Sequence, residues 1–407
     1  MSIEPSAASR SRPPFDRIPS GRLWVTSALF FLQFVAVGVY FTFLNVYLKE
    51  LGLTGAEIGF IGMTTGIVSM LGTFGWGYLS DRTGRPRVLI AIGAIGALLS
   101  AQLLPLVAQL GLQPAFWYYV VVNGLVGIMN AAIMTLIDST AIAMLGNQRQ
   151  KYGRYRLGGS VGFIVGGIGA GYLYDWVGYG WMFPAFGAVM LVFAATAQLL
   201  PARVTRLAGS GRSELGQMVR RPEWLILIIS LFVFWIGYNI SFVFNAVILK
   251  DLGASDQLIS FAAVIGTIVE LPFMANSGRL IQRFGAPRLL ALGLLMQTVR
   301  FVLLSQLRVP EWAVAINMLN GPGYVFFWNS AVYLVAQLAP RGLGATAQGF
   351  LTSALNLAGI VSSALSGVLY DGLGYSGLYG VVAVICLGSL LLFVVGVVLR
   401  KPTDATV

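Results

Sequence analysis

The sequence predicts an all-α membrane protein with twelve transmembrane helices in two parallel six-helix halves. Three observations lead to this prediction: the composition is strongly apolar, apolar runs long enough to span a bilayer recur along the chain, and short motifs of the first half return in the second. Of the 407 residues, 57% are hydrophobic and only 10% are charged, against roughly 25% charged residues in soluble domains. Such a surface suits lipid rather than water.

The composition also excludes several chemistries. The chain has one cysteine, Cys386, and no histidine, which removes a disulfide framework, a His-built metal site and Ser–His or Cys–His catalytic pairs. We therefore expect no enzyme activity, no catalytic residues, no metal and no cofactor. The net charge of +11 does not indicate a nucleic-acid partner. The cations lie in small groups between apolar segments, which is the pattern that sets the orientation of a membrane protein.

Each element follows from where the apolar runs begin and end. Residues 1–22 carry Arg10, Arg12 and Arg17 without the apolar core and cleavage site of a signal peptide, so we expect a disordered cytoplasmic tail. A span needs about 20 apolar residues to cross roughly 30 Å of hydrocarbon. The runs predict spans at 23–48, 55–80, 87–109, 116–145, 154–177, 181–200, 224–249, 256–281, 288–307, 311–338, 345–370 and 375–399.

The remaining segments are predicted from their polarity. We expect an N-terminal half at 23–201, a cytoplasmic linker at 202–223, a C-terminal half at 224–399 and a cytoplasmic tail at 400–407. Membrane β-strands are not expected, because barrel strands alternate in polarity over segments of about ten residues.

The positive charges predict the orientation. With the N-terminus inside, only Lys49, Lys250 and Arg308 of the 26 Lys and Arg residues face outward and Arg300 lies within a span, while all the others face the cytoplasm. Because cytoplasmic loops are enriched in Lys and Arg, we expect an even number of spans and both termini in the cytoplasm. The membrane is expected to be a bacterial-type inner membrane.

The two halves repeat one design. Lys49–Gly52 reappears as Lys250–Gly253, and Tyr174-Asp175 returns as Tyr370-Asp371. Parallel halves related by an axis along the membrane normal are typical of transporters that rock about a midplane site. The residues alone therefore indicate a secondary transporter or a similar pore-forming bundle. No Walker loop is present, so ATP is not the expected driving force.

The loop after the second span resembles the signature loop of the major facilitator superfamily. It contains the residues Gly77, Asp81, Arg82, Gly84 and Arg85. The resemblance implies that the Asp and Arg positions form a cytoplasmic gate, which latches the two halves together when the carrier faces outward. Alternatively, the loop is a short turn in which Gly84 permits the backbone conformation and the arginines only follow the positive-inside rule.

A narrower resemblance is to the lactose permease and its nucleoside and phenylpropionate symporter relatives. It rests on short patches around Tyr40, Asp138, Arg156, Glu270 and Arg300. The resemblance implies that Asp138 and Arg156 hold the substrate and that Glu270 and Arg300 serve binding and proton coupling. The tenth span departs from this pattern, since Asn320 and Gly323 stand where the permease has His and Glu.

Ionisable groups within spans cost roughly 2.5 to 3.5 kcal/mol each and usually face a cavity or a partner. Glu270 and Arg300 fall near the midplane, so we expect them to form a pair that loads and releases a proton, or else a permanently locked ion pair. Asp138 is expected within reach of Arg154 or Arg156, either as a substrate site or as a salt bridge at the cytoplasmic rim.

Aromatic and amide side chains are expected to line the rest of the cavity. They are Tyr40, Asn45, Tyr238, Asn239, Asn245, Asn320, Tyr324, Trp328 and Asn329. Such a lining suits a neutral polyhydroxylated or aromatic solute, although each aromatic residue alone is also consistent with helix packing.

We therefore predict a proton-coupled importer of a small sugar, nucleoside or similar solute that acts as a monomer in the lipid bilayer by alternating access. A proton-driven efflux antiporter, an uncoupled facilitator, sodium coupling, and a sensor or enzyme on a transporter-like scaffold remain open at this point.

Overall fold

The computed structural model describes residues 23–111, 116–145, 152–201, 221–339 and 343–398, and within these ranges every regular element is helical. The predicted tails and most of the predicted linker lie outside the described residues. Ten described helices are long and apolar enough to cross a membrane, with the bent helix α15 counted once.

The N-terminal bundle contains the first group of helices. They are α1 (Leu23–Ala36), the π-helix η2 (Val37–Phe41), α2 (Leu44–Glu50), α3 (Gly55–Thr83), α4 (Pro86–Leu103), α5 (Leu106–Gln109), α6 (Phe116–Leu145), α7 (Tyr152–Val177), the 3-10 helix η4 (Tyr179–Trp181) and α8 (Met182–Ala197).

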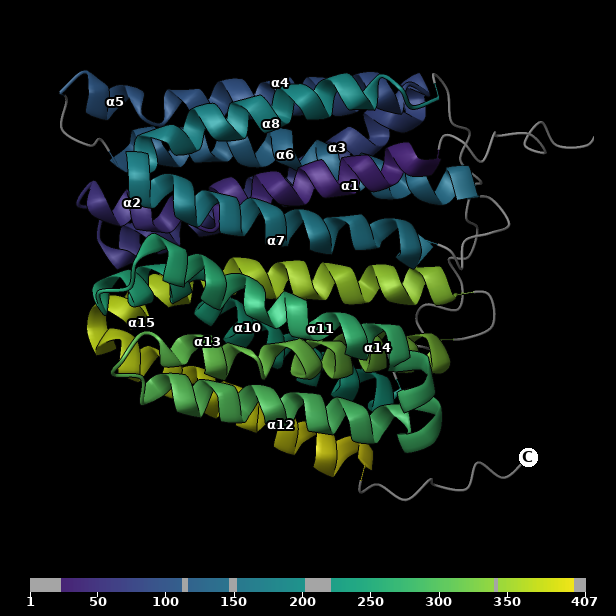
Figure 1. Cartoon of the computed structure of the whole chain (residues 1–407). Helices are drawn as coiled ribbons and strands as arrows, with labels where there is room; N and C mark the ends of the chain where they lie inside the picture. The colour runs from purple at the N-terminus through teal and green to yellow at the C-terminus, as the bar shows by residue number, and fades with distance from the viewer. Residues whose placement is uncertain (1–22, 112–115, 146–151, 202–220, 340–342, 399–407) are drawn as a thin grey trace, which may run out of the picture.

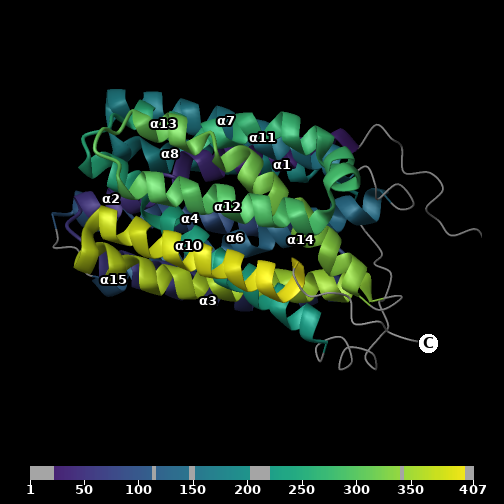
Figure 2. The same ribbon diagram turned by 90° about the horizontal axis from the view of Figure 1, so that it is seen from below.

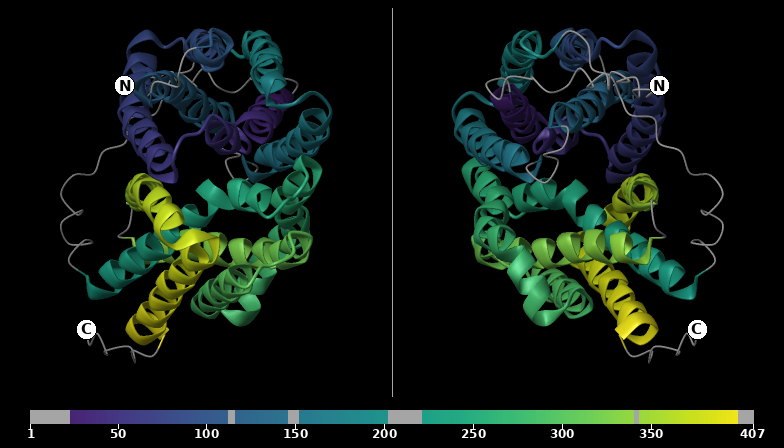
Figure 3. Two further views of the ribbon diagram at one scale, coloured as in Figure 1. Left: turned by 90° about the vertical axis from the view of Figure 1, so that its left-hand side faces the viewer. Right: turned by 90° about the vertical axis from the view of Figure 1, so that its right-hand side faces the viewer.

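The C-terminal bundle contains the second group. Its helices are α10 (Pro222–Asp251), α11 (Asp256–Phe284), α12 (Ala286–Ser305), α13 (Trp312–Asn317), α14 (Asn320–Leu338), α15 (Gly344–Phe393) and the π-helix η5 (Val394–Val398). Figure 1 shows the two groups as separate layers, and Figure 3 shows each as a bundle viewed along its helices.

The helix ends follow from local chemistry. Thr54 caps α3, since its hydroxyl accepts from the Glu57 N–H while the Glu57 carboxylate accepts from the Thr54 N–H. The Ser255 hydroxyl caps α11 by accepting from the N–H of Leu258. The two caps occupy corresponding places in the repeated motifs.

Helix α15 is broken at Gly374. At 1.5 Å per residue, a straight helix of its 50 residues would be about 75 Å long, more than twice the hydrocarbon thickness of roughly 30 Å. The Gly374 backbone has a φ of 64° and interrupts the helix, a conformation that favours glycine. Figure 2 shows α15 turning back on itself. The two arms match the spans predicted at 345–370 and 375–399.

Three predicted segments differ from the structure. The third span ends at Leu103, before Pro105, and α5 follows as a separate helix, because proline lacks the N–H that would continue the helix. The tenth span is divided between α13 and α14. Helix α10 begins at Pro222, inside the predicted linker, because proline is well suited to a first helical position.

We call the end of the molecule where α2 ends and α3 and α11 begin the distal end, at the left of Figure 1. The beginning of α1 and the end of α14 lie at the opposite end (Figure 1). Within the N-terminal bundle, α1 and α7 approach closely, since a Cβ added at Gly162 would overlap the backbone carbonyl of Phe31. Small residues permit such contacts between membrane helices.

Candidate functional site

A cavity of about 770 Å³ lies between the two bundles. Residues from α1, η2, α2, α3, α6 and α7 line one side, and residues from α10, α11, α12, α13 and α14 line the other. This volume lies within the range of roughly 300 to 1,000 Å³ that is typical of small-molecule sites. The charged residues in the lining are Arg156, Glu270 and Arg300.

Asp138 is bound by a tyrosine. The Tyr152 hydroxyl donates to Asp138 Oδ1 over 2.5 Å, and Tyr152 and Arg156 both line the cavity whereas Asp138 does not. The charge of Arg156 acts on Asp138, but the two form no ion pair in the described chain, where we had expected Arg154 or Arg156 to reach the acid. The sequence reasoning missed Tyr152, although its position four residues before Arg156 places both on one helix face.

Arg156 also faces an acid of the other bundle. Glu270 lines the cavity from α11, and Arg156 is the cation whose charge acts on it. Arg156 and Glu270 therefore line the same cavity from opposite bundles, and no ion pair joins them in the described residues.

The expected pair between Glu270 and Arg300 is not formed. Arg300 Nε donates to Asn317 Oδ1 over 2.9 Å, and Arg300 Nη1 donates to Gln297 Oε1 over 3.1 Å. No ion pair joins Glu270 to Arg300, both of which the structure describes. Equal depth in the membrane did not decide the pairing, because the arginine is directed toward Gln297 of its own helix and Asn317 of α13.

These amides belong to a longer network. Gln297 Nε2 donates to Asn320 Oδ1 over 3.0 Å, and the Tyr238 hydroxyl donates to the same oxygen over 3.3 Å. Asn317 Nδ2 donates to the Ala262 carbonyl over 2.9 Å. The network joins α10, α12 and α14 through neutral groups, and Arg300 connects it through Asn317 of α13 to α11.

An aromatic wall lies beside the network. The rings of Tyr324 and Trp328 are nearly parallel, with centroids 6.2 Å apart and 9° between their planes, and those of Trp235 and Tyr238 are 5.3 Å apart at 17°. All four residues line the cavity, as does Asn239, whose amide donates to the Trp235 carbonyl. Trp235 was not predicted, although it precedes Tyr238 by three residues and so shares its helix face.

Tyr40 does not line the cavity, contrary to the sequence prediction. Its ring is fully buried and contacts Phe183 and Phe186 of α8, with centroids 6.2 and 4.7 Å away. Phe41 and Asn45, four residues apart, lie in the cavity wall instead. The pattern of helix faces explains this difference, since Tyr40 points to another side of the first span.

The predicted gate residues lie at the end of the molecule where α3 ends and α4 begins. Asp81 and Arg82 are exposed near the end of α3, Gly77 is half-buried one turn earlier, and Arg85 precedes α4. Gly84 ends α3 with a φ of 60°, a backbone conformation that favours glycine, as expected if the loop is a short turn. Their role as a gate stays a prediction.

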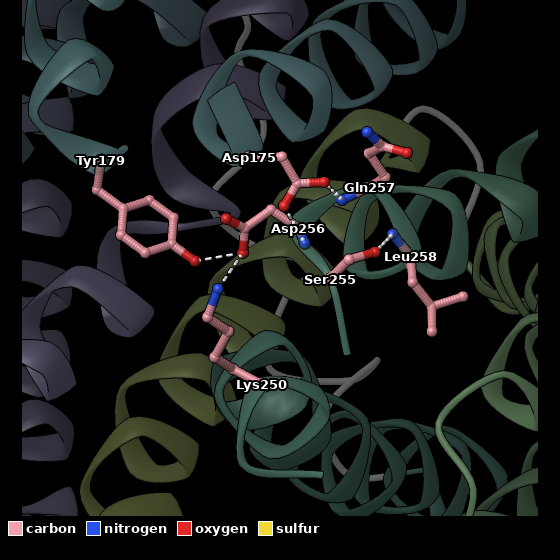
Figure 4. Close-up of polar contacts among 7 residues, drawn as sticks. All are labelled: Asp175, Tyr179, Lys250, Ser255, Asp256, Gln257 and Leu258. Carbon is pink, nitrogen blue, oxygen red and sulfur yellow. Dashed lines mark hydrogen bonds and ion pairs between the residues drawn. The ribbon is translucent and has the colours of Figure 1, made fainter. Parts of the chain in front are cut away.

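At the distal end, two aspartates join the bundles. Asp175 of α7 accepts the N–H groups of Asp256 and Gln257, at 2.9 and 3.2 Å, where α11 begins (Figure 4). Asp371 of α15 accepts those of Gly55 and Ala56, at 2.9 and 2.7 Å, where α3 begins. We call these two contacts the distal latches.

The first latch is reinforced by further contacts. Asp256 itself accepts the Tyr179 hydroxyl at 2.5 Å and forms an ion pair with Lys250 at 2.7 Å (Figure 4). The sequence repeat of Tyr174-Asp175 and Tyr370-Asp371 signalled an equivalent pair of positions, but not their partners. Carboxylates are favourable at helix N-termini, where backbone N–H groups lack partners.

Comparisons with known proteins agree with this geometry. The model of the MFS_1 like family matches residues 23–381. The maltose permease of Geobacillus stearothermophilus is 31% identical over 335 residues, which cover 81% of this chain and 82% of the permease.

Solved structures share the fold at lower identity. The nucleoside transporter NupG has a TM-score of 0.76 at 19% identity, covering 93% of this chain and 100% of that one. The D-xylose-proton symporter has a TM-score of 0.67 at 18% identity, covering 91% and 96%. The chain belongs to the MFS_1 like family and is a multi-pass membrane transporter of the major facilitator superfamily, not an enzyme.

Proposed function

We propose that the chain imports a small solute of the sugar or nucleoside type by alternating access, coupled to proton symport. In this proposal it acts as a monomer in a bacterial-type inner membrane, with twelve spans, halves at 23–201 and 224–399, and both termini in the cytoplasm. Ten described helices are long and apolar enough to span the membrane when α15 is counted once. In this proposal α15 supplies two spans, one for each arm, and α13 and α14 together supply another.

The observation that carries this proposal is that Arg156 and Glu270 line one cavity from opposite bundles. A guanidinium and a carboxylate can bind adjacent hydroxyls of a solute by charge-assisted hydrogen bonds. On the N-terminal side of the cavity, Arg156 and Tyr152 belong to the lining, and Asp138 accepts the Tyr152 hydroxyl from outside it. In this proposal Arg156 binds the solute directly and Asp138 acts beside it.

Glu270 would carry the proton. While Glu270 is protonated, Arg156 is available to the solute and to Asp138. When rocking of the halves brings Arg156 onto Glu270, the carboxylate pairs with the arginine, and the proton and the solute leave on the same side. Arg300, which the structure directs elsewhere, has no part in this exchange.

The distal latches support an inward-facing state. They join α7 to α11 and α15 to α3, and the Asn45 amide also donates to the Val243 carbonyl of the other bundle over 2.8 Å. If both termini are cytoplasmic, the distal end faces outward, and its contacts close the cavity on that side.

The test is the pH of a lightly buffered, anaerobic suspension of cells that express the protein. Maltose, xylose and uridine are added one at a time to cells with the native chain, Glu270→Gln, or the control Glu311→Gln, whose exposed carboxylate lies outside the cavity. We expect alkalinisation with at least one solute, lost in Glu270→Gln and retained in Glu311→Gln.

Other outcomes would contradict the proposal. Acidification on addition of solute would indicate antiport and export. Uptake of labelled solute without any pH change would indicate a facilitator or, if it required sodium, a sodium carrier.

A further inference from the structure

Arg300 is a buried cation without an acidic partner. Its side chain is only 7% exposed, yet it lines the cavity. Its hydrogen bonds go to the neutral amides of Asn317 and Gln297. Within the described part of the chain no carboxylate lies within ion-pair distance of it.

The acids near the cavity are engaged elsewhere. Asp138 accepts the Tyr152 hydroxyl and lies outside the cavity lining, and Glu270 lines the cavity without an ion pair to Arg300. Charges within membrane spans are usually paired or face a pathway. The missing negative charge at Arg300 is the feature that requires an explanation.

The geometry of the guanidinium indicates what it can bind. A guanidinium has five N–H donors in a planar fork, and the two hydrogen bonds to protein use one donor on Nε and one on Nη1. The remaining donors belong to the two Nη groups. The planar pair of donors matches the two oxygens of a carboxylate, and Asn317 and Gln297 hold the group in one orientation.

We propose that Arg300 binds a carboxylate carried by the transported solute, so that the cavity prefers an acidic derivative to the corresponding neutral solute. This inference rests on the transport function proposed above and names the substrate class of the same cavity. The amide network connects Arg300 through Gln297 and Asn320 to Tyr238. The ring or sugar body of a solute anchored at Arg300 would therefore lie against the aromatic wall, where ring faces stack.

The test compares matched acids and neutral analogues on the purified full chain in detergent. The probe pairs are 3-phenylpropionate with 3-phenylpropionamide, and glucuronate with glucose, and binding is measured by quenching of tryptophan fluorescence, since Trp235 and Trp328 line the cavity. For the native chain we expect at least one acid to bind ten times or more tighter than its neutral partner. This comparison needs no variant and is independent of variant folding.

Variants then assign the preference to Arg300. Arg300→Gln is expected to remove the difference between acid and amide, Arg300→Lys to retain part of it, and the control Arg308→Gln, outside the cavity lining, to leave it unchanged. Equal affinity for acid and neutral partner, equal weakening of both by Arg300→Gln, or no binding of either acid would overturn the inference.

The two proposals fail in different experiments. If Glu270-dependent alkalinisation with a neutral sugar or nucleoside is retained while no acid is preferred, only the Arg300 inference is wrong. If the acids bind but no solute moves with protons, the proposed coupling is wrong.

Discussion

The distal latches predict that removing two negative charges will open the cavity on the distal side. In Asp175→Asn and Asp371→Asn, the carboxylate that accepts two backbone N–H groups becomes an amide with one acceptor oxygen. The halves then lose attraction only in the conformation in which these groups meet. The equilibrium should therefore shift toward the state that is open at the distal end.

The magnitude follows from the type of hydrogen bond. Bonds to charged groups contribute about 1.5 to 3 kcal/mol, against about 0.5 to 1.5 kcal/mol for neutral ones. Because both carboxylates are exposed, water weakens the difference, and we take about 1 kcal/mol for each latch. This corresponds to about a fivefold shift for each single variant and about a 30-fold shift for the double variant, since separate sites add.

The assay is labelling of a cysteine in the cavity wall. Ala246 lines the cavity from α10 and is buried, and the native Cys386 is buried, so Ala246→Cys supplies one reactive site for a membrane-impermeant maleimide added outside intact cells. We expect its labelling rate to rise about fivefold and about 30-fold in the single and double latch variants.

The control is Asp251→Asn, because the Asp251 carboxylate accepts the Tyr370 hydroxyl within the same bundle. Unchanged labelling in the double latch variant would refute the reasoning. An equal rise in Asp251→Asn would show that the effect comes from lost charge at this end and not from the contacts between the bundles.

Two further predictions concern packing and substrate positioning. The new methyl group of Gly162→Ala would overlap the Phe31 carbonyl, so this variant should destabilise the fold by about 1 to 3 kcal/mol and lower its Tm. The control Gly169→Ala, which has open space around it, should keep the native Tm. Equal Tm values for the two variants would contradict the α1–α7 contact. Tyr152→Phe removes the hydrogen bond to Asp138. It should raise the KM for solute several-fold and leave the ratio of transported protons to solute unchanged. An unchanged KM would mean that Tyr152 does not position this acid.

Hydropathy predicted the positions of the helices well, because the thickness of the bilayer sets the length of an apolar run. Helix α6 has the predicted bounds, 116–145, and Gly374 lies between the two last predicted spans. Interruptions within a span were not predictable in this way. The π-helical turn η2 and the break between α13 and α14 lie within apolar segments. Neither interruption changes the mean apolarity of its segment, which is the quantity that hydropathy reports.

Side-chain partners were the harder part of the site. Glu270, Arg300 and Tyr238 line the cavity as predicted, because polar groups within apolar spans avoid lipid. Which residue each one contacts depends on rotation and packing of helices that are distant in sequence. Arg300 binds amides of its own and another helix, and Tyr40 packs against α8, for this reason.

The central claim is that solute moves together with a proton that Glu270 carries. The most direct test uses proteoliposomes with an alkaline interior and a labelled solute that causes alkalinisation in cells. The account predicts that the native chain accumulates solute above the outside concentration, that a protonophore abolishes this accumulation, and that Glu270→Gln allows only equilibration. Accumulation by Glu270→Gln, or accumulation by the native chain without a pH gradient, would contradict the claim.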